Sequence, residues 1–414
     1  MDLLQDAWKI IDAALLAAQP DTAVRKALEQ LPPIRGKLIL VSVGKAAWQM
    51  ALAAAQALEG RLTEGVVITK YGHSRGPISR LTIYEAGHPI PDDHTYRATQ
   101  AAIQAVSGLN PEDLVLFLLS GGGSALFELP LIPPEELADL TRSLLACGAD
   151  IVEMNTLRKR LSAVKGGKFA QLCAPARVFS VVLSDILGDP LDMIASGPAC
   201  PDRSTAVQAL SIVQKYSLGL SPLAMSLLAQ ETPKELPNAE SHITGSVRQL
   251  CAAAADAARA LGYAPVLLTN SLNCEAREAG RFFASIARCH AGEPRRLAFL
   301  AGGETVVHLT GSGKGGRNQE LVLAASEGME GLEGALLFSI GSDGTDGPTD
   351  AAGGWTDGHT AGLLAHAGLS IHDALRENDA YHALRAVNRL LFTGPTGTNV
   401  NDLTVLLLCP QQPR

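Results

Sequence analysis

Apolar and polar positions along the chain form two recurring patterns, short apolar runs and longer amphipathic stretches. The short runs have the length of strands, and some are apolar throughout, as expected for strands covered on both faces. In the first half of the chain they lie at 38–44, 65–70, 81–87, 113–120 and 178–185. Helix-like stretches separate them. This β–α–β rhythm predicts a parallel, doubly wound sheet of the Rossmann-like type.

A polar segment interrupts the rhythm between 217 and 240, where serine and proline are frequent. We place a domain boundary near residue 235, which gives an N-terminal domain of residues 1–235 and a C-terminal domain of residues 236–414. The chain of 414 residues is long enough for two domains. After the break the rhythm resumes, and it predicts strands at 264–270, 335–344 and 402–408, with two further strands within 296–311.

Composition and charge exclude several classes of protein. The net charge of -8 argues against a general nucleic-acid binder. No apolar run is long enough to span a bilayer, and the N-terminal stretch 1–19 reads as an amphipathic helix rather than a signal peptide. The seven cysteines contain no C-x-x-C pair, which argues against a zinc site and a disulfide scaffold. We therefore expect a cytoplasmic protein.

Glycines gather where predicted strands end, and ligands of open α/β sheets bind at that edge. The segment SGGGSALF (120–127) follows an apolar strand, so the N–H groups of Gly121, Gly122, Gly123 and Ser124 are able to point at an anion. The alternative is a plain strand-to-helix turn.

Lysine 45 stands at the first turn of a predicted helix, directly after the strand in VSVGKAAW. A positive charge there opposes the helix dipole. We therefore favour an anion site at Lys45 over a solvated surface lysine.

The segment GSGKGGRNQE (311–320) fits G-x-G-x-x-G, a weak dinucleotide signal when it occurs alone. Lys314 and Arg317 lie inside and beside the loop, and such cations suit a more highly charged or transferring phosphate. Three interpretations stay open, namely NAD, another phosphate or carboxylate, and a flexible turn.

Acidic turns supply candidate metal ligands and bases. Asp185 and Asp189 lie at and after a strand end, where hard oxygen ligands suit Mg²⁺ together with substrate phosphates. Asp189 is also a candidate for taking a proton from a hydroxyl nucleophile. Asp343 in a second glycine-rich loop and Glu304 in GGETVVHL are further candidates, with turn chemistry or a protective edge charge as the alternatives.

A basic run, RKRLSAVKGGK (158–168), follows in the first half of the chain. On a helix it brings Arg158, Lys165 and Lys168 close to one face. A solvated face and a basic wall for an anionic substrate are both consistent with this pattern.

These segments together resemble the glycerate 2-kinases with a MOFRL-type C-terminal domain. The segments that carry the resemblance are VSVGKAAW, GHPIPD, LSGGGSALF, NTLRKRLSAVKGGK, SDILGDPLDMIASGP, GGETVV, GGRNQE, SDGTDGPTDAAGG and TNVNDL. The resemblance implies two α/β domains with the active site in the cleft between them. It also implies ATP, a divalent cation such as Mg²⁺, and phosphorylation of D-glycerate at its 2-hydroxyl to give 2-phosphoglycerate.

The expected site combines this resemblance with the residues' own chemistry. The catalytic residues are expected to be Lys45 and Arg317, which the resemblance implies, and Asp189. The residues expected to bind substrate or phosphate are Gly121, Gly122, Gly123, Ser124, Arg158, Lys165, Ser196, Gly197, Gly313, Lys314, Gly316 and Asn318. The expected metal ligands are Asp185, Glu304 and Asp343.

The expected partners are D-glycerate and ATP, without nucleic acid or membrane, and a homodimer is left open. Two other functions are left open, an NAD(P)H-dependent hydroxypyruvate reductase and a non-catalytic sugar-acid-binding protein. Cations in two anion loops disfavour the second of these, because a sensor has no evident need for them.

Overall fold

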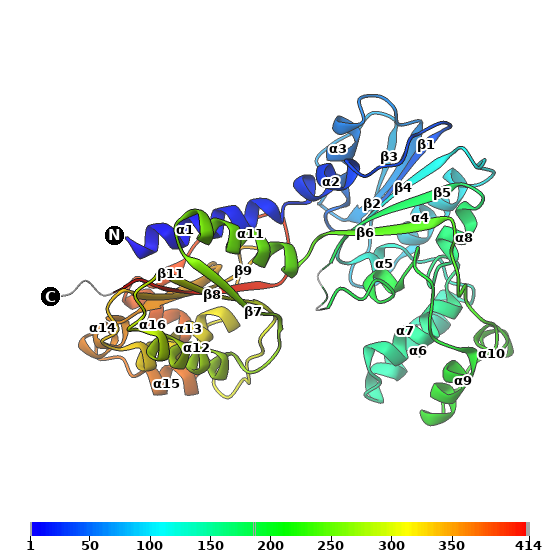
Figure 1. Ribbon diagram of the computed structural model, residues 1–414. Coiled ribbons are helices and arrows are strands. Elements are labelled where there is room, and N and C mark those ends of the chain that lie inside the picture. Colours follow the sequence, from blue (N-terminus) through cyan, green and yellow to red (C-terminus); the bar gives the residue numbers. More distant parts are fainter. Residues whose placement is uncertain (1, 185, 187, 411–414) are drawn as a thin grey trace. The chain divides into compact units, whose positions relative to one another are not determined.

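The chain divides into two compact units in the computed structural model, which describes residues 2–184, 186 and 188–410 (Figure 1). The N-terminal unit comprises Ala23–Ser184 and Asp189–Thr244. The C-terminal unit comprises Met1–Thr22, Asp185–Gly188 and Gly245–Arg414. Each unit has its own six-stranded sheet. The predicted class, two α/β domains with a Rossmann-like sheet in the first, is confirmed.

The sheet of the N-terminal unit has the strand order β3-β2-β1-β4-β5-β6, which is that of the doubly wound dinucleotide-binding fold. Its strands are β1 (Leu38–Val43), β2 (Glu64–Lys70), β3 (Leu81–Ala86), β4 (Leu114–Leu119), β5 (Arg177–Leu183) and β6 (Ala239–Gly245). The first five run parallel. The order of strands reverses between β1 and β4, so the carboxyl ends of these two strands form the edge where ligands are expected.

Helices cover both faces of this sheet, and β1 and β4 are therefore buried along their whole length. The helices of this unit are α2 (Pro20–Leu28), α3 (Ala47–Ala57), α4 (Asp93–Ala105), α5 (Gly123–Leu126), α6 (Pro134–Ala146), α7 (Ile151–Leu161), α8 (Lys168–Cys173), the 3-10 helix η1 (Ile194–Ser196), α9 (Ala206–Lys215) and α10 (Pro222–Leu228). Apolar residues of α2 and α3 pack on one face, and those of α4, α5 and α8 pack on the other. Helices α6, α7, α9 and α10 form a separate apolar cluster.

The sheet of the C-terminal unit is mixed, with the order β11-β10-β9-β12-β8-β7. Its strands are β7 (Ala264–Leu272), β8 (Leu297–Gly303), β9 (Ala335–Gly341), β10 (Gly353–Asp357), β11 (Leu390–Leu391) and β12 (Asp402–Leu408). Only β7 and β8 pair in parallel among these described strands. Strand β12, the last in the chain, lies between β8 and β9, so the C-terminal segment completes the centre of the sheet.

Helices also cover both faces of this second sheet. They are α1 (Leu3–Ala17), α11 (Val247–Ala260), α12 (Ala276–His290), α13 (Arg317–Met329), α14 (Thr360–His366), α15 (Ile371–Arg376) and α16 (Ala380–Ala386). Helices α1 and α11 pack on one face, and α12, α13 and α16 pack on the other. Among the described residues, no helix combines the length and the apolar character needed to cross a membrane.

The strand predictions differ from the structure at four places. Strands β6, β10 and β11 are short or polar in sequence and were not predicted. The stretch 304–311 was expected to be a strand but forms only an isolated bridge, between Glu275 and Val306. Its neighbour β8 already pairs with β12 on one side and β7 on the other, which leaves no free edge there.

The predicted boundary at residue 235 assigns residues 1–22 to the N-terminal domain, whereas the structure places them in the C-terminal unit. The reason is the apolar face of α1, on which Ile10 and Ile11 are fully buried in a cluster with α11. Asp6 of α1 also accepts hydrogen bonds from Arg296, at 2.7 Å, and from the Tyr263 hydroxyl, at 3.0 Å. Residues 236–244, in contrast, belong to the N-terminal unit, and they include nearly all of β6.

We expect that Ile10→Ala lowers the free energy of unfolding of the C-terminal unit by about 2–5 kcal/mol, because it leaves a cavity between α1 and α11. Urea titration measures this change. Asp12→Ala, an exposed position on the same helix, is the matched control and should change stability by less than about 0.5 kcal/mol. Equal stability of Ile10→Ala and wild type would contradict the packing of α1.

Candidate active site

Lys45 lies at the carboxyl edge of the N-terminal sheet, where the loops after β1 and β4 are joined. The backbone N–H of Lys45 donates to the carbonyl of Gly121 at 2.9 Å, and that of Ala46 donates to the Ser120 hydroxyl at 3.1 Å. The Lys45 side chain is exposed, and within the described part of the chain its ammonium group has no hydrogen-bond or ion-pair partner. An unpaired cation at a topological switch point is suited to receive an anionic ligand.

The glycine loop after β4 presents free backbone donors beside Lys45. Gly122 has a positive φ of 84°, and Gly123 packs against Ala195, so that a Cβ at Gly123 would lie 2.7 Å from the Ala195 Cβ. The N–H groups of residues 121–124 have no acceptor among the described residues. The loop therefore has the properties predicted for anion binding, with glycine required by close packing and by the left-handed turn.

His88, which the sequence analysis left unassigned, completes this edge. A Cβ at Gly122 would lie 3.0 Å from His88 Nε2 and 3.2 Å from Lys45 Cγ, so the imidazole, the loop and the lysine are in contact. Burial lowers the pKa of His88, and the charges of Lys45, Lys70 and His73 lower it further. Both effects favour the neutral form of the His88 imidazole. The segment GHPIPD was the only sequence signal for it, because the neighbours of His88 come from distant loops.

Most cations of the predicted basic wall are structural. Lys165 was expected to bind substrate, but its ammonium group is fully buried and bonds Glu128 at 2.9 Å and the carbonyls of Ser124 and Phe127. Lys168 donates to the carbonyls of Arg160 and Ser162. Lys165 therefore fixes the loop that follows Gly123 and has no free donor for a substrate.

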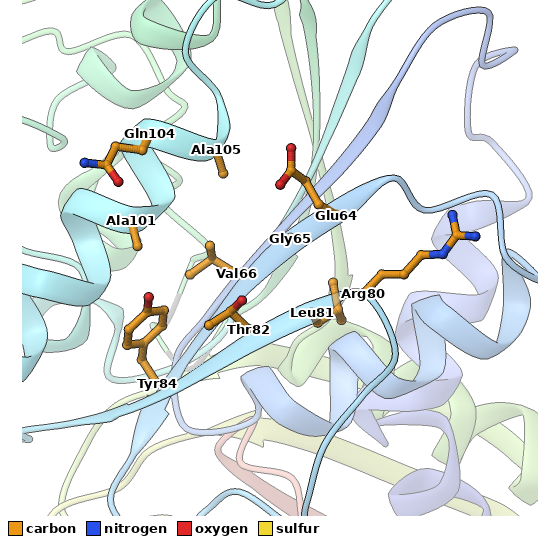
Figure 2. A pocket seen from close by; sticks show the side chains of 10 residues that line it. All are labelled: Glu64, Gly65, Val66, Arg80, Leu81, Thr82, Tyr84, Ala101, Gln104 and Ala105. Carbon is orange, nitrogen blue, oxygen red and sulfur yellow. The ribbon is translucent and has the colours of Figure 1, made fainter.

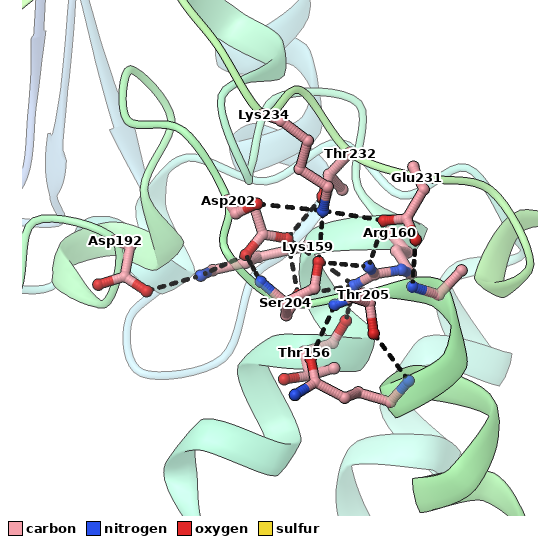
Figure 3. Close-up of polar contacts among 12 residues, drawn as sticks. Thr156, Lys159, Arg160, Asp192, Asp202, Ser204, Thr205, Glu231, Thr232 and Lys234 are labelled. Atoms are coloured by element: carbon pink, nitrogen blue, oxygen red, sulfur yellow. Dashed lines mark hydrogen bonds and ion pairs between the residues drawn. The ribbon is translucent and has the colours of Figure 1, made fainter.

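Two neighbouring residues of α7 belong to a buried ion network (Figure 3). Lys159 contacts Asp202 at 3.1 Å and Asp192 at 3.3 Å, and Arg160 contacts Asp202 and Glu231. In Figure 3 the Asp202 carboxylate lies at the centre, and hydrogen bonds from Ser204 and Thr232 complete its shell. These cations hold the chain around η1 in place.

Ser196 and Gly197 also support the site rather than line it. The Ser196 hydroxyl is buried and donates to Asn155 Oδ1 at 2.9 Å, while its carbonyl accepts from the N–H of Gly166. The carbonyl of Gly197 accepts from the N–H of Gly167, and Gly197 has a positive φ of 64°. The polar groups of these two residues are thus already paired within the chain, and their role in binding phosphate stays a prediction.

The two acidic residues of the preceding loop have different outcomes. Asp185 lies outside the described residues. Asp189 has a positive φ of 53°, and its Oδ1 is buried without a hydrogen-bond partner among the described residues. A strained backbone with an unpaired carboxylate oxygen is typical of a functional position, and the role of Asp189 as a base stays a prediction.

In the C-terminal unit, Arg317 is oriented by two carboxylates. Its guanidinium donates to both oxygens of Asp402, through Nε at 2.5 Å and Nη2 at 2.9 Å, and through Nη1 to Glu304 at 2.7 Å. Burial raises the pKa of Asp402 to about 6, against the opposing effect of Arg317. Two of the five guanidinium N–H groups have no described partner. The exposed fraction of the Arg317 side chain is 33%.

Two neighbouring cavities open at Arg317. One, of about 280 Å³, is lined by Glu304, Arg317, Ser342, Asp343, Asn399, Asn401 and Asp402. The other, of about 780 Å³, shares Glu304, Arg317 and Asp343 and extends along residues 311–316. The structure thus brings together Arg317 and two of the predicted metal ligands, Glu304 and Asp343. The sequence analysis missed Asp402, which TNVNDL contains but which no local pattern links to Arg317.

In the glycine loop before α13, several backbone N–H groups already have acceptors within the chain. The N–H groups of Gly311, Gly313 and Lys314 donate to residues 377–379. Those of Asn318 and Gln319, at the helix N-terminus, donate to the buried Asp346 carboxylate at 3.1 and 2.9 Å. These contacts argue against a dinucleotide, and the phosphate-binding role of Gly313, Lys314 and Gly316 stays a prediction.

The remaining residues of this loop are also fixed internally. A Cβ at Gly316 would overlap the Asp346 carboxylate, which explains the glycine. The Asn318 side chain is buried between Asp346 and Ser339, and the ammonium group of Lys314 lies 4.5 Å from the centre of the Tyr381 ring. The polar atoms of the Asn318 side chain are therefore bonded within the chain, and the binding roles of Asn318 and Lys314 stay predictions.

A third hollow, of about 590 Å³, lies in the N-terminal unit between strands β2 and β3 and helix α4 (Figure 2). It is near the start of the strands, since Glu64, Gly65 and Leu81 line it, and this is the edge opposite Lys45. In Figure 2 the Arg80 side chain points away from the strands, and its guanidinium bonds the carbonyl of Leu62. This hollow lacks the features of a substrate site.

Comparison with known proteins agrees with the fold and the site. A family described as a domain of unknown function (DUF4147) matches residues 6–229, and the MOFRL family matches residues 297–402. A D-glycerate 2-kinase from Thermotoga maritima is 52% identical over 408 residues, which cover 97% of each chain. The chain belongs to the glycerate kinase family. The predicted resemblance is thereby confirmed.

Two further relatives of this glycerate kinase family are informative. The crystal structure of glycerate kinase from Thermotoga maritima superposes with a TM-score of 0.94 at 51% identity, covering 98% of this chain and 99% of that one. A relative from Agrobacterium vitis, 38% identical over 97% of this chain and 93% of its own, carries a provisional hydroxypyruvate reductase name. The contacts of residues 311–319 offer no dinucleotide site that would support such an activity here.

We expect the strength of the ion pair between Asp402 and Arg317 to depend on pH. Its pKa of about 6 lies above the ordinary aspartate value, so the carboxylate is protonated, and the ion pair weakened, as pH falls through 6. Asp402→Asn should lower kcat by about 10- to 100-fold at pH 8, from the loss of a charge-assisted pair, and by clearly less at pH 5.

The ratio of wild-type to Asp402→Asn kcat measures this effect, because titrations common to both proteins cancel. Asp256→Asn, an exposed position on α11, is the control and should give a ratio near one throughout. A wild-type to Asp402→Asn ratio that is the same at pH 5 and pH 8 would contradict the assignment.

Proposed function

We propose that the chain is an ATP-dependent kinase that phosphorylates the 2-hydroxyl of D-glycerate, giving 2-phosphoglycerate and ADP. The observation that carries the proposal is the unpaired Lys45 beside the free N–H groups of residues 121–124. Phosphoryl transfer needs mainly positioning and charge neutralisation, which this edge supplies. The glycerate kinase relatives support the substrate and its reacting hydroxyl.

Lys45 and Arg317 are the proposed catalytic cations. Lys45 supplies a mobile ammonium group, and Arg317 supplies a guanidinium already oriented by Asp402 and Glu304. Charge builds on the phosphoryl oxygens during transfer, and preorganised donors stabilise it without reorganisation. The new bond forms between the 2-hydroxyl oxygen and the γ-phosphorus, and the bond from that phosphorus to ADP breaks. Asp189 is the proposed acceptor of the hydroxyl proton.

A divalent cation such as Mg²⁺ accompanies ATP in this proposal. The described residues contain no group of three carboxylate, histidine or cysteine side chains that could hold a metal. Mg²⁺ is usually bound by one or two carboxylates plus substrate phosphates, and Glu304 and Asp343, which line the same cavity as Arg317, fit that role. When bound, the cation would neutralise phosphate charge.

We also propose a cytoplasmic location. All seven cysteines are free thiols, and three of them are exposed, a composition that suits a reducing compartment. A homodimer stays a prediction.

The reaction is tested by incubating the protein with ATP, Mg²⁺ and D-glycerate and identifying the phosphorylated product by ³¹P NMR. We expect 2-phosphoglycerate and stoichiometric ADP. Formation of 3-phosphoglycerate would contradict the proposed acceptor hydroxyl, and oxidation of NADH by hydroxypyruvate would favour the reductase instead.

Lys45→Ala and Arg317→Ala should each lower kcat by about 10²- to 10³-fold, the usual effect of removing one transition-state donor. Steady-state kinetics at saturating ATP and D-glycerate measure both. Lys26→Ala on α2 and Arg281→Ala on α12, which are exposed cations, are the controls and should keep wild-type rates. Near-normal kcat in either active-site variant would refute its role.

A further inference from the structure

Arg158 is an exception among the cations of α7 and the segment after it. Lys159, Arg160, Lys165 and Lys168 each bond carboxylates or carbonyls. The Arg158 side chain is half-buried, its Nε is buried with no hydrogen-bond partner, and no described carboxylate pairs with it. The same run of sequence thus contains four cations that have carboxylate or carbonyl partners and one, Arg158, that has none among the described residues.

An unpaired guanidinium that is partly buried is costly unless a ligand neutralises it. The surroundings increase that cost. Burial lowers the pKa of Lys165, and the positive charge of Arg158 lowers it further, so the two cations lie close enough to repel. Glu128 balances only one of these two positive charges, through its ion pair with Lys165. One unit of positive charge is left over for a ligand.

The position of Arg158 relates it to the loop beside Lys45. Asn155, nearly one turn earlier on the same side of α7, receives the hydrogen bond of Ser196 in η1. Ala195 of η1 packs against Gly123, and Lys165 bonds the carbonyl of Ser124. Arg158 therefore belongs to the same group of elements as the glycine loop.

We propose that Arg158 binds the carboxylate of D-glycerate and makes the enzyme select hydroxy acids over uncharged polyols. This inference rests on the proposed kinase function. The planar guanidinium offers two parallel N–H donors that match the two oxygens of a carboxylate. Lys45 then remains available to contact the phosphoryl group. One unpaired cation thus binds the acceptor, and the other binds the group that is transferred.

The experiment compares Arg158→Gln and Arg158→Lys with wild type in the full-length chain. We expect Arg158→Gln to raise the KM for D-glycerate by about 10- to 100-fold, from the loss of a charge-assisted hydrogen-bond pair. The KM for ATP should change less than about threefold. Arg158→Lys keeps the positive charge but loses the two parallel N–H donors of the guanidinium. Its KM for D-glycerate should lie between those of Arg158→Gln and wild type.

A carboxylate-free substrate separates recognition from a structural role. The methyl ester of D-glycerate keeps the 2-hydroxyl but has no carboxylate charge. The ratio of kcat/KM for the acid to that for the ester should fall at least tenfold in Arg158→Gln. Arg142→Gln, an exposed arginine paired with Asp139 on α6, is the matched control and should keep the wild-type ratio. Thermal unfolding of each variant shows whether it is folded.

Two results would overturn the inference. A D-glycerate KM within twofold of wild type in Arg158→Gln would show that the carboxylate binds elsewhere. Equal losses with acid and ester, or an equal rise in the KM for ATP, would show that Arg158 only supports the fold. In both cases phosphorylation of D-glycerate by the wild type leaves the proposed function intact, whereas its absence in the wild type would refute that function itself.

Discussion

The arrangement of charge around the carboxyl edge of the N-terminal sheet is the constraint on which the proposed function depends. Cations near this edge are numerous, yet most are neutralised by partners within the chain, as Lys165 is by Glu128 and Lys159 by Asp202. A protein that satisfies so many buried cations leaves one unpaired only where something else pairs with it. The unpaired, half-buried Arg158 and the exposed Lys45 are therefore the proposed binding positions for anionic substrates. The cations that have partners within the chain fix the segments that position Lys45 and Arg158.

In the C-terminal unit, positive charge is positioned in a different way. The N-terminus of α13 would normally attract a phosphate, but the Asp346 carboxylate already occupies it. Positive charge is instead concentrated on the first residue of that helix, Arg317, whose direction is set by Asp402 and Glu304. A carboxylate-oriented guanidinium is rigid, whereas the exposed ammonium group of Lys45 is free to move. The two proposed catalytic cations thus differ in how far the surrounding residues fix them.

Much of this could be predicted from the sequence, where local patterns decide the structure. Apolar runs identified β1, β2, β3, β4, β5, β7, β8, β9 and β12, and the motif positions of Lys45 and Arg317 gave two cations of the site. Long-range contacts could not be predicted: the spacing of G-x-G-x-x-G suggested a phosphate loop, but Asp346 caps the following helix from 28 residues away. For the same reason the internal partners of Lys165 and Ser196 were not anticipated, since burial and partners are not visible in a linear pattern. His88 was left unassigned because its neighbours come from other loops.

The central claim, that Lys45 neutralises charge that develops only during transfer, is tested most directly by binding a transition-state analogue. Isothermal titration calorimetry can compare the affinity for ADP with aluminium fluoride, Mg²⁺ and D-glycerate between wild type and Lys45→Ala. The account predicts that Lys45→Ala weakens this complex by about 10²-fold or more while the affinity for ADP alone changes little. Equal affinities of the two proteins for the analogue complex, or an equal loss for ADP alone, would contradict it.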